Sequence, residues 1–427
     1  MKIEILYVKF LECSEVSTDT RKIEKNSMFF ALKGENFDAN TFTEEAIKKG
    51  AKYIVIDNPN YQIEGKTILV DDVLSTLQKL ANYHRKKLKT PIIALTGSNG
   101  KTTTKELIKA VLSAKFNTIA TIGNLNNHIG VPLTLLNFNK ETEIGIVEMG
   151  ANHQKEIELL CQITEPNFGY ITNFGKAHLE GFGGVQGIIK GKSELYDYLR
   201  TNNQIAFVNL DDALQQEKTR DIKNYSFSKT TENADVKITS IEANPMVKIH
   251  FNSTNVTSHL IGAYNANNIN AAITIGKYFK IEDSVIKEAI ENYIPTNNRS
   301  QLIEKNSNEI ILDAYNANPS SMTAAISNFI QIEKASKVVI LGDMFELGEE
   351  SLTEHKNVIN LLKNETTITS HLVGKDFYLN KENSSHLHFY QNFGEFSNYL
   401  KKNELKNSFI LIKGSRGMAL ERVLEFI

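Results

Sequence analysis

The chain has 427 residues, of which 41% are hydrophobic, and its 48 Lys and Arg nearly balance its 50 Asp and Glu, leaving a net charge of −2. This length predicts two or three domains. The near-neutral charge gives no general attraction to nucleic acid or anionic membranes, and no apolar run is long enough to span a bilayer. The only cysteines, Cys13 and Cys161, fit no zinc spacing, so we expect reduced thiols in a cytoplasmic protein.

Residues 1–88 predict a small α/β domain, with strands at 27–32, 53–56 and 67–70 and helices at 43–49 and after Asp71-Asp72. A polar stretch precedes the first strand and consists of Thr18, Asp19, Thr20 and Arg21. Its hydroxyl, carboxylate and guanidinium groups suit a uracil, a ribose or a diphosphate, and equally a solvated loop with one salt bridge. The basic run 84–89 predicts a solvated helix end, and Pro91 marks the domain boundary.

A glycine-rich loop at 96–104, T-G-S-N-G-K-T-T-T, joins an apolar strand at 92–95 to a helix at 105–115. Free backbone N–H groups and the positive helix end make such a loop an anion site. Gly97 and Gly100 let the backbone curl around a phosphate, Lys101 suits the terminal phosphates, and the Thr102 hydroxyl suits magnesium. The alternative is a tight turn with a surface lysine. The nucleotide-binding candidates here are Gly97, Ser98, Asn99, Gly100, Lys101, Thr102 and Thr103.

The loop opens a central domain over 89–296, for which we expect a mostly parallel sheet. Its strand at 144–148 ends in Glu148, and an acid at the carboxyl end of a parallel strand suits magnesium or caps a helix. His178 follows another predicted strand, where a lone histidine is either a ligand or structural. Asn265 and Asn268 lie at a helix start, where asparagine commonly acts as a cap.

Residues 297–427 predict a third domain with a Rossmann-like, mostly parallel sheet. Strands at 309–313, 337–341 and 409–413 alternate with helices at 319–333, 351–363 and 418–427. Arg299, at the junction, suits a γ-phosphate, and Asp313 suits ribose hydroxyls. The alternatives are an interdomain salt bridge for Arg299 and a helix cap for Asp313.

Motifs in the second and third domains resemble those of the Mur ligase family, whose glycine loop is also similar to that of folylpolyglutamate synthases. In the first domain, Asp19-Thr20-Arg21 resembles the D-S-R of the same family. Six motifs follow the order of the MurF branch: V-E-M-G-A-N-H at 147–153, I-T-N-F-G-K-A-H-L-E at 171–180, G-K-S-E-L at 191–195, D-A-Y-N-A-N-P-S-S-M at 313–322, L-G-D-M-F-E-L-G at 341–348 and K-G-S-R at 413–416. The sequence departs from the family pattern at Asn40, His128 and Tyr264, to which we assign no role.

The resemblance implies a set of site residues. Lys192 corresponds to a lysine that becomes a carbamate, with the nearby Lys190 as the competing candidate, and it would hold one magnesium ion with His178. Thr102 and Glu148 would hold a second ion. The implied catalytic residues are Lys101, Lys192, His178 and Arg299; Asn268 would approach adenine; and the implied substrate contacts are Thr18, Asp19, Thr20, Arg21, Asn127, Asn316 and Asn318.

The resemblance also implies the reaction. We expect an ATP-dependent, ADP-forming ligase that adds D-alanyl-D-alanine to UDP-N-acetylmuramoyl-tripeptide through an acyl phosphate, in peptidoglycan precursor synthesis and so in cell shape and division. It implies ATP and two Mg²⁺ ions, small-molecule substrates, no nucleic acid, no membrane insertion and a monomer. The rivals are another Mur ligase, a folylpolyglutamate synthase, a P-loop small-molecule kinase, or a nucleotide-gated binding protein without ligase activity.

Overall fold

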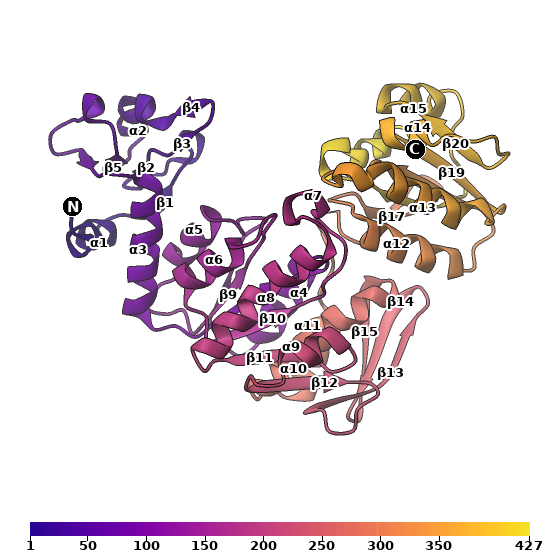
Figure 1. Cartoon of the computed structure of the whole chain (residues 1–427), viewed down its shortest axis with the longest axis horizontal. Coiled ribbons are helices and arrows are strands. Elements are labelled where there is room, and N and C mark those ends of the chain that lie inside the picture. The colour runs from indigo at the N-terminus through magenta and orange to yellow at the C-terminus, as the bar shows by residue number, and fades with distance from the viewer. Residues whose placement is uncertain (297) are drawn as a thin grey trace.

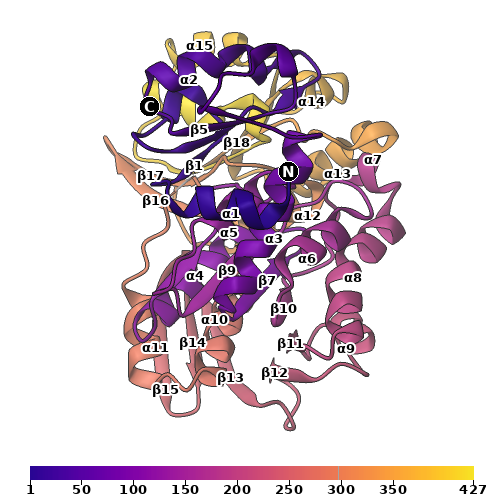
Figure 2. The ribbon, with the colours of Figure 1, turned by 90° about the vertical axis from the view of Figure 1, so that its left-hand side faces the viewer.

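The structure is a computed structural model that describes residues 1–296 and 298–427. The predicted first residue of the third domain, 297, lies outside these described residues. Figures 1 and 2 show three α/β regions in chain order, with the first and third both placed above the central one. Each region is built on its own mainly parallel sheet, so the predicted fold class is confirmed.

The N-terminal region contains a parallel sheet in the order β1-β2-β5-β6. Its strands are β1 (Val16–Ser17), β2 (Met28–Phe30), β5 (Tyr53–Ile56) and β6 (Thr67–Leu69), and β3 (Lys33–Gly34) and β4 (Phe37–Asp38) form a small hairpin. Its helices are α1 (Ile3–Leu11), α2 (Thr43–Lys48) and α3 (Val73–Leu88). As predicted, α3 begins beside an acidic cap, because Asp72 accepts a hydrogen bond of 2.6 Å from the Ser75 backbone.

The end of α3 is only in part the solvated helix end that the basic run 84–89 predicts, because Lys86, Lys87 and Lys89 are exposed. His84 and Arg85 are buried. The Nε2 of His84 lies 2.8 Å from the Phe138 carbonyl, and Arg85 donates to the carbonyl of Thr164 at 3.0 Å. The prediction was wrong for these two residues because α3 packs against helices of the central region, which the local sequence does not reveal.

The central region is a nine-stranded sheet in the order β15-β14-β13-β12-β11-β10-β7-β9-β8. The strands are parallel from β8 to β13, and β13, β14 and β15 pair antiparallel. They are β7 (Ile92–Thr96), β8 (Thr118–Ala120), β9 (Ile144–Glu148), β10 (Phe168–Ile171), β11 (Ile205–Asn209), β12 (Asn224–Ser228), β13 (Val236–Ala243), β14 (Met246–Phe251) and β15 (Thr254–Ile261). The helices are α4 (Lys101–Ser113), α5 (Gly130–Leu136), α6 (Glu156–Thr164), α7 (Leu179–Phe182), α8 (Val185–Thr201), α9 (Ala213–Lys218), α10 (Ala266–Tyr278) and α11 (Asp283–Glu291).

The third region has a six-stranded sheet in the order β16-β17-β21-β18-β19-β20, parallel except for the β16–β17 pair. The strands are β16 (Gln301–Lys305), β17 (Asn308–Asp313), β18 (Lys337–Gly342), β19 (Ile368–Val373), β20 (Leu387–Tyr390) and β21 (Phe409–Lys413). The helices are α12 (Pro319–Gln331), α13 (Ser351–Lys363), α14 (Lys375–Leu379) and α15 (Phe393–Leu400). The helix predicted at 418–427 is instead a pair of 3₁₀ segments, because Ala419 has a left-handed backbone, with φ 48°.

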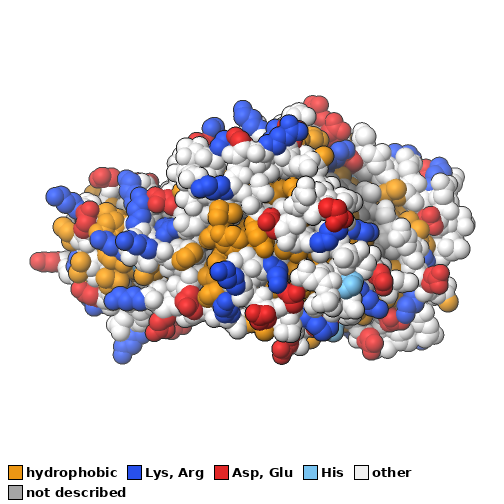
Figure 3. All heavy atoms as spheres, turned by 90° about the horizontal axis from the view of Figure 1, so that it is seen from below, with side chains coloured by type: hydrophobic (Ala, Val, Ile, Leu, Met, Phe, Trp, Pro, Cys, Tyr) orange, Lys and Arg blue, Asp and Glu red, His pale blue; other side chains and the backbone are white. Residues whose placement is uncertain are grey.

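The surface agrees with the near-neutral composition. On the face in Figure 3, basic and acidic side chains are interspersed rather than gathered by sign. None of the helices in the described part of the chain combines the length and the apolar character that a membrane crossing requires.

Candidate active site

The glycine loop lies between β7 and α4 and is shaped by its two glycines. Gly97 has a φ of 139°, and a Cβ there would lie 2.0 Å from the Thr172 hydroxyl. Gly100 has a φ of 80°, and its Cβ would lie 2.5 Å from Oδ1 of Asn268. Both positions therefore require glycine for two reasons, the left-handed backbone and the close neighbour.

Lys101 begins α4 with its ammonium group folded back over the loop. Its Nζ donates to the carbonyls of Gly97 at 2.7 Å and Ser98 at 3.3 Å. Burial lowers the pKa of Lys101, whereas the charge of Glu148 raises it. The side-chain hydroxyl of Ser98 is buried without a hydrogen-bond partner in the described chain. The loop thus holds a cation and an unpaired polar group where its sequence predicts phosphates.

Glu148 ends β9 beside the loop. Its Oε1 accepts hydrogen bonds from the Thr102 hydroxyl at 3.3 Å and from the Asn126 amide at 2.8 Å. Its Oε2 is buried without a hydrogen-bond partner among the described residues, and the Lys105 ammonium lies 3.9 Å away. A hydroxyl beside a carboxylate with an unsatisfied oxygen is a donor set that fits magnesium. Within residues 1–296 and 298–427, no group of three or more His, Cys, Asp or Glu side chains is arranged to hold a metal ion. Other oxygen ligands would therefore have to complete the coordination.

Lys192 lies on α8 and is only 1% exposed. Its Nζ donates to the Ala151 carbonyl at 3.0 Å and lies 4.9 Å from the centre of the Phe182 ring. Burial lowers the pKa of Lys192 well below its ordinary value, and the nearby charge of Lys101 lowers it further. A buried, neutral amine is the form that reacts with carbon dioxide, so the environment fits a carbamate at this position.

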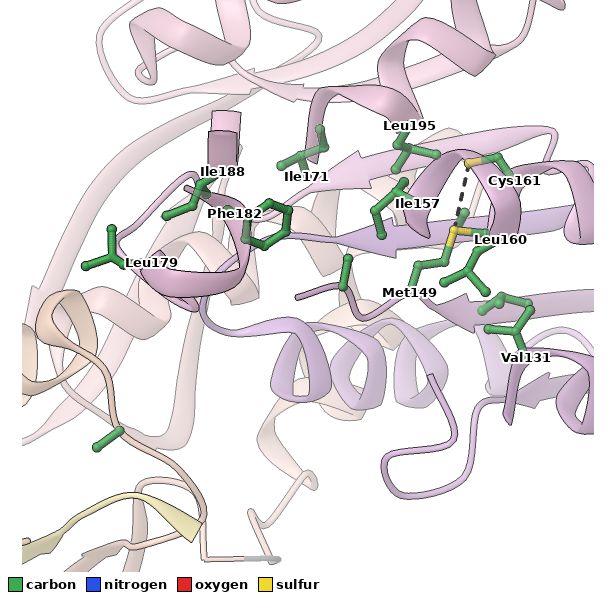
Figure 4. Close-up of a cluster of buried hydrophobic side chains, with 14 of the residues drawn as sticks. Val131, Met149, Ile157, Leu160, Cys161, Ile171, Leu179, Phe182, Ile188 and Leu195 are labelled. Atoms are coloured by element: carbon green, nitrogen blue, oxygen red, sulfur yellow. Dashed lines mark hydrogen bonds between the residues drawn. The ribbon is translucent and has the colours of Figure 1, made fainter. Parts of the chain in front are cut away.

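The packing beneath α8 fixes this part of the site. Figure 4 shows Leu179, Phe182 and Ile188 together at one end of a buried cluster. At the other end, the Cys161 thiol contacts the sulfur of Met149 at 3.9 Å, and both cysteines of the chain are free thiols. The cluster joins α6, α7 and α8 to the sheet, so it positions Lys192 and His178.

His178 lies at the start of α7, and its Nδ1 pairs with the carboxylate of Glu346 in the third region. Burial lowers the pKa of His178, and the charges of Lys101 and Lys192 add to this effect, whereas Glu346 raises it.

One cavity of about 860 Å³ joins most of the predicted site residues. It lies between the central and third regions, and Lys413, Tyr315 and Asn126 are also part of its wall. The predicted residues that line it are Ser98, Asn99, Gly100, Lys101, Thr102, Thr103, Asn127, Glu148, His178, Asn268, Arg299, Asp313, Asn316 and Asn318. Gly97 and Lys192 lie beside it, in contact with Lys101 and Ala151.

The third region contributes the charged groups of Arg299, Asp313 and Lys413 to this cavity. Arg299 stacks on Tyr315, with its guanidinium carbon 3.7 Å from the ring centre. Asp313 accepts a hydrogen bond of 2.6 Å from the Lys413 ammonium and another of 3.1 Å from the Ser300 backbone. Asp313 is therefore held in place by an ion pair, and it does not cap a helix, because the cap of α12 is Asn318.

The two regions also touch directly at the glycine loop. The Asn318 amide donates to Oδ1 of Asn99 at 2.7 Å. The Lys176 backbone donates to the Ser320 hydroxyl at 2.7 Å, and its ammonium pairs with Glu354 at 2.7 Å. These contacts bring Arg299 and Asp313 to the same cavity as the glycine loop, although each lies about two hundred residues further along the chain.

Comparisons with known proteins agree with this geometry. The Mur ligase family catalytic domain matches residues 12–96, the Mur ligase middle domain residues 95–276, and the Mur ligase glutamate ligase domain residues 298–416. The UDP-N-acetylmuramoyl-tripeptide–D-alanyl-D-alanine ligase of Bacillus subtilis is 35% identical over 423 residues, covering 96% of this chain and 92% of that protein. The chain belongs to the Mur ligase family. Among solved members of the family, a MurF crystal structure from Acinetobacter baumannii is 30% identical, with a TM-score of 0.87 and coverage of 99% of this chain and 97% of that one. The MurF ligase from Thermotoga maritima in complex with ADP is 27% identical, with a TM-score of 0.83 and coverage of 98% and 97%.

The three residues at which this chain departs from the Mur ligase pattern each have a defined place in the structure. Asn40 is buried, and its amide donates to Asp38 at 2.6 Å and to Asp57 at 2.9 Å. The Tyr264 hydroxyl lies 2.9 Å from that of Ser300, so it ties the central region to the third. His128 lines the cavity.

The polar stretch Thr18–Arg21 is not part of the cavity between the central and third regions. Asp19 caps the 3₁₀ turn Thr20–Lys22, and its Oδ2 pairs with Arg21 at 2.8 Å. This salt bridge is the one that the alternative interpretation of the stretch expects. The stretch directly follows β1, at the carboxyl end of the first sheet, where ligands of parallel sheets bind.

Several residues that shape the candidate site were not among the predicted site residues. Asn173 and Glu346 lie inside motifs that carry the family resemblance, and Asn126 directly precedes the predicted Asn127. Asn173 accepts a hydrogen bond from the Asn99 backbone at 3.2 Å. The sequence does not indicate the burial of Lys105, because a charged residue at this helix position is ordinarily exposed. In the structure Lys105 is fully buried, and its ammonium group donates a hydrogen bond to the Thr121 carbonyl at 2.7 Å.

Proposed function

We propose that this protein is an ATP-dependent, ADP-forming ligase that joins D-alanyl-D-alanine to UDP-N-acetylmuramoyl-tripeptide in peptidoglycan precursor synthesis. The main observation that supports this proposal is the cavity in which the glycine loop, Glu148, Arg299 and Asp313 meet. This is a nucleotide site closed by a second domain, as an enzyme that must protect an acyl phosphate from water requires. The full-length similarity to the Bacillus subtilis ligase supports the choice of substrates.

In the proposed complex the glycine loop surrounds the phosphates of ATP. Lys101 leaves the loop carbonyls and turns to the terminal phosphates, and the N–H groups of residues 99–103 face the same anions. Asn268, fixed by hydrogen bonds to Thr104 and Asn265, approaches adenine. Asp313 accepts from ribose hydroxyls.

Magnesium would be held by Thr102 and Glu148 at one position and by His178 and a carbamate of Lys192 at the other. When bound, the ions supply positive charge beside the phosphates and the reacting carboxylate. The fit rests on the unsatisfied oxygen of Glu148 and on the burial of Lys192. Lys190 is exposed on the same helix, and the absence of burial makes it the weaker candidate for the carbamate.

The reaction has three steps. An oxygen of the tripeptide's terminal carboxylate attacks the γ-phosphorus, and ADP leaves. The amine of D-alanyl-D-alanine then attacks the carbonyl carbon of the acyl phosphate and loses a proton. Finally, the tetrahedral intermediate expels inorganic phosphate and leaves an amide. Every species is anionic, so Lys101 and Arg299 stabilise charge throughout, and each such contact lowers the barrier by about 3 kcal/mol.

The three domains would divide the substrates. Residues 1–88, with Thr18 to Arg21, would bind the UDP end, residues 89–296 ATP, and residues 297–427 the incoming dipeptide near Asn316 and Asn318, with Asn127 facing the peptide from the central domain. We further propose that the enzyme is a cytoplasmic monomer acting on small molecules, consistent with its two free thiols.

An acceptor panel tests this function. The purified full chain is incubated with ATP, Mg²⁺ and UDP-N-acetylmuramoyl-tripeptide, and phosphate release is measured with D-alanyl-D-alanine, with single amino acids or with glutamate. We expect release only with the dipeptide, together with a product of the corresponding mass. Equal release without an amine would favour a kinase or a nucleotide-gated protein, and release with glutamate alone would favour a folylpolyglutamate synthase.

A further inference from the structure

The motif L-G-D-M-F-E-L-G at 341–348 has no role in the function as proposed so far. It forms the loop after β18 and carries Glu346, whose side chain is 55% exposed. The Glu346 carboxylate pairs with Nδ1 of His178 in the central region. An exposed acid of one region thus reaches a candidate metal ligand of another.

The loop that carries Glu346 is held rigidly by its own domain. His355 accepts a hydrogen bond from the Met344 backbone at 3.0 Å, and the Ser415 hydroxyl accepts one from the Phe345 backbone at 2.9 Å. The Asp343 carboxylate accepts two backbone N–H groups at the start of α14, at 3.0 and 3.1 Å. Three buried side chains therefore fix the residues immediately before one exposed carboxylate.

Both partners of the pair have an unusual backbone. His178 has a φ of 55° and Glu346 a φ of 60°, the left-handed region that residues other than glycine seldom adopt. Such conformations persist only where the surroundings hold them, and they are frequent at functional sites. The Glu180 backbone also donates to the Glu346 carbonyl at 3.4 Å, so the two segments are docked through main chain as well as side chain.

The chemistry of the pair fixes the state of the imidazole. A carboxylate only accepts hydrogen bonds, so the proton of a neutral His178 must lie on Nδ1. The lone pair is then on Nε2, the nitrogen through which the ring can bind a metal ion. Metal-binding histidines characteristically donate their other N–H to a carboxylate or carbonyl, which orients the ring and increases its basicity.

We propose that Glu346 is a positioning residue that orients His178 for the metal ion, and that it does so from a different domain. The inference rests on the proposed function, because it takes His178 as a ligand of magnesium. Its consequence is that the second metal position is complete only while the third domain is docked. The docking has other supports, such as the pair between Lys176 and Glu354, so loss of Glu346 alone leaves the domains in contact.

The test uses the full chain with Mn²⁺ in place of Mg²⁺ and a non-hydrolysable ATP analogue. Pulsed electron paramagnetic resonance detects nitrogen coupling from an imidazole bound to Mn²⁺, and a titration gives the Mn²⁺ affinity. Four variants are compared with wild type: Glu346→Gln, His178→Ala, Glu354→Gln and Glu349→Gln. Glu354→Gln breaks an ion pair across the same boundary, and Glu349→Gln removes an exposed charge from the 3₁₀ turn that follows the loop.

We expect wild type, Glu354→Gln and Glu349→Gln to share the nitrogen signal and His178→Ala to lack it. Glu346→Gln should show a weakened signal and about tenfold lower Mn²⁺ affinity, the range typical for a ligand's hydrogen-bond partner. A Glu346→Gln protein with the wild-type signal and affinity would overturn the inference and leave the metal assignment standing. A wild-type signal no different from that of His178→Ala would instead remove His178 from the proposed site, and the inference with it. Because the Glu346 side chain is exposed, both Glu346→Gln and Glu346→Ala should fold. The alanine variant repeats the test without a side-chain amide that could accept the hydrogen bond from His178.

Discussion

Replacing Lys192 by methionine separates its chemistry from its packing. Methionine fills a similar volume in the buried site and removes the amine. The structural loss is the 3.0 Å hydrogen bond to the Ala151 carbonyl, which leaves a buried acceptor unpaired at a cost of about 1–3 kcal/mol. The substitution also stabilises the fold, because an amine no longer has to be buried. The lowered pKa of Lys192 indicates that burial of its charged form is unfavourable. The two effects oppose each other, so we expect the free energy of unfolding to change by no more than about 2 kcal/mol.

Catalysis should respond far more strongly. If a carbamate of Lys192 holds a cation beside the reacting phosphates, its loss removes a preorganised electrostatic contact of about 3 kcal/mol, on the order of a hundredfold or more in turnover. Dipeptide-dependent phosphate release and a thermal melt are measured on the same samples. Lys190→Met is the matched control, since Lys190 is exposed on the same helix, and it should behave as wild type.

Mass spectrometry under carbon dioxide completes this experiment. Wild type should gain the mass of one carbon dioxide, and the gain should be absent from Lys192→Met and present in Lys190→Met. Turnover of Lys192→Met close to that of wild type would refute the reasoning, as would a mass gain that follows Lys190.

Three further predictions test other parts of the site and fold. Lys101→Met should abolish ligation and weaken ATP binding at least tenfold while the melting temperature is retained, as measured by calorimetry; unchanged ATP affinity would contradict the assignment. Gly97→Ala should lower the free energy of unfolding, measured in urea, by more than the ~1–2 kcal/mol that a left-handed backbone costs an alanine. The control Gly65→Ala, at a φ of 71° with open space around it, should lose only that amount. Equal losses would show that the contact with Thr172 is unimportant. Burial lowers the pKa of His371 to about 3, so the unfolded chain takes up a proton below about pH 6.5 that the folded chain refuses, and stability falls with falling pH. Relative to His371→Phe, wild type should lose about 2–3 kcal/mol between pH 7 and 4.5, and parallel pH profiles would refute this.

The glycine loop could be predicted because its constraints are local. Gly97, Gly100, Lys101 and Thr102 owe their roles to a short stretch of backbone that joins a strand to a helix, and those elements follow from periodicity. The position of Glu148 at the cavity could be predicted for a related reason: the carboxyl end of a parallel strand faces the ligand side of the sheet.

Contacts between distant segments could not be predicted in this way. Glu346 meets His178 across 168 residues, and nothing near either residue encodes the partner. Lys105 and the pair His84–Arg85 have the composition of exposed helix positions, and only the packing of neighbouring helices makes them buried. Burial of a charged residue is a property of the assembled fold, so local pattern misjudges it.

The central claim is that residues 97–103 hold the phosphates of ATP. A crystal structure of the full chain with Mg²⁺ and a non-hydrolysable ATP analogue tests it most directly. We predict the triphosphate against this loop, with the Lys101 ammonium moved from the carbonyls of Gly97 and Ser98 to the terminal phosphates. A triphosphate bound elsewhere in the molecule, with Lys101 still on those carbonyls, would contradict the account.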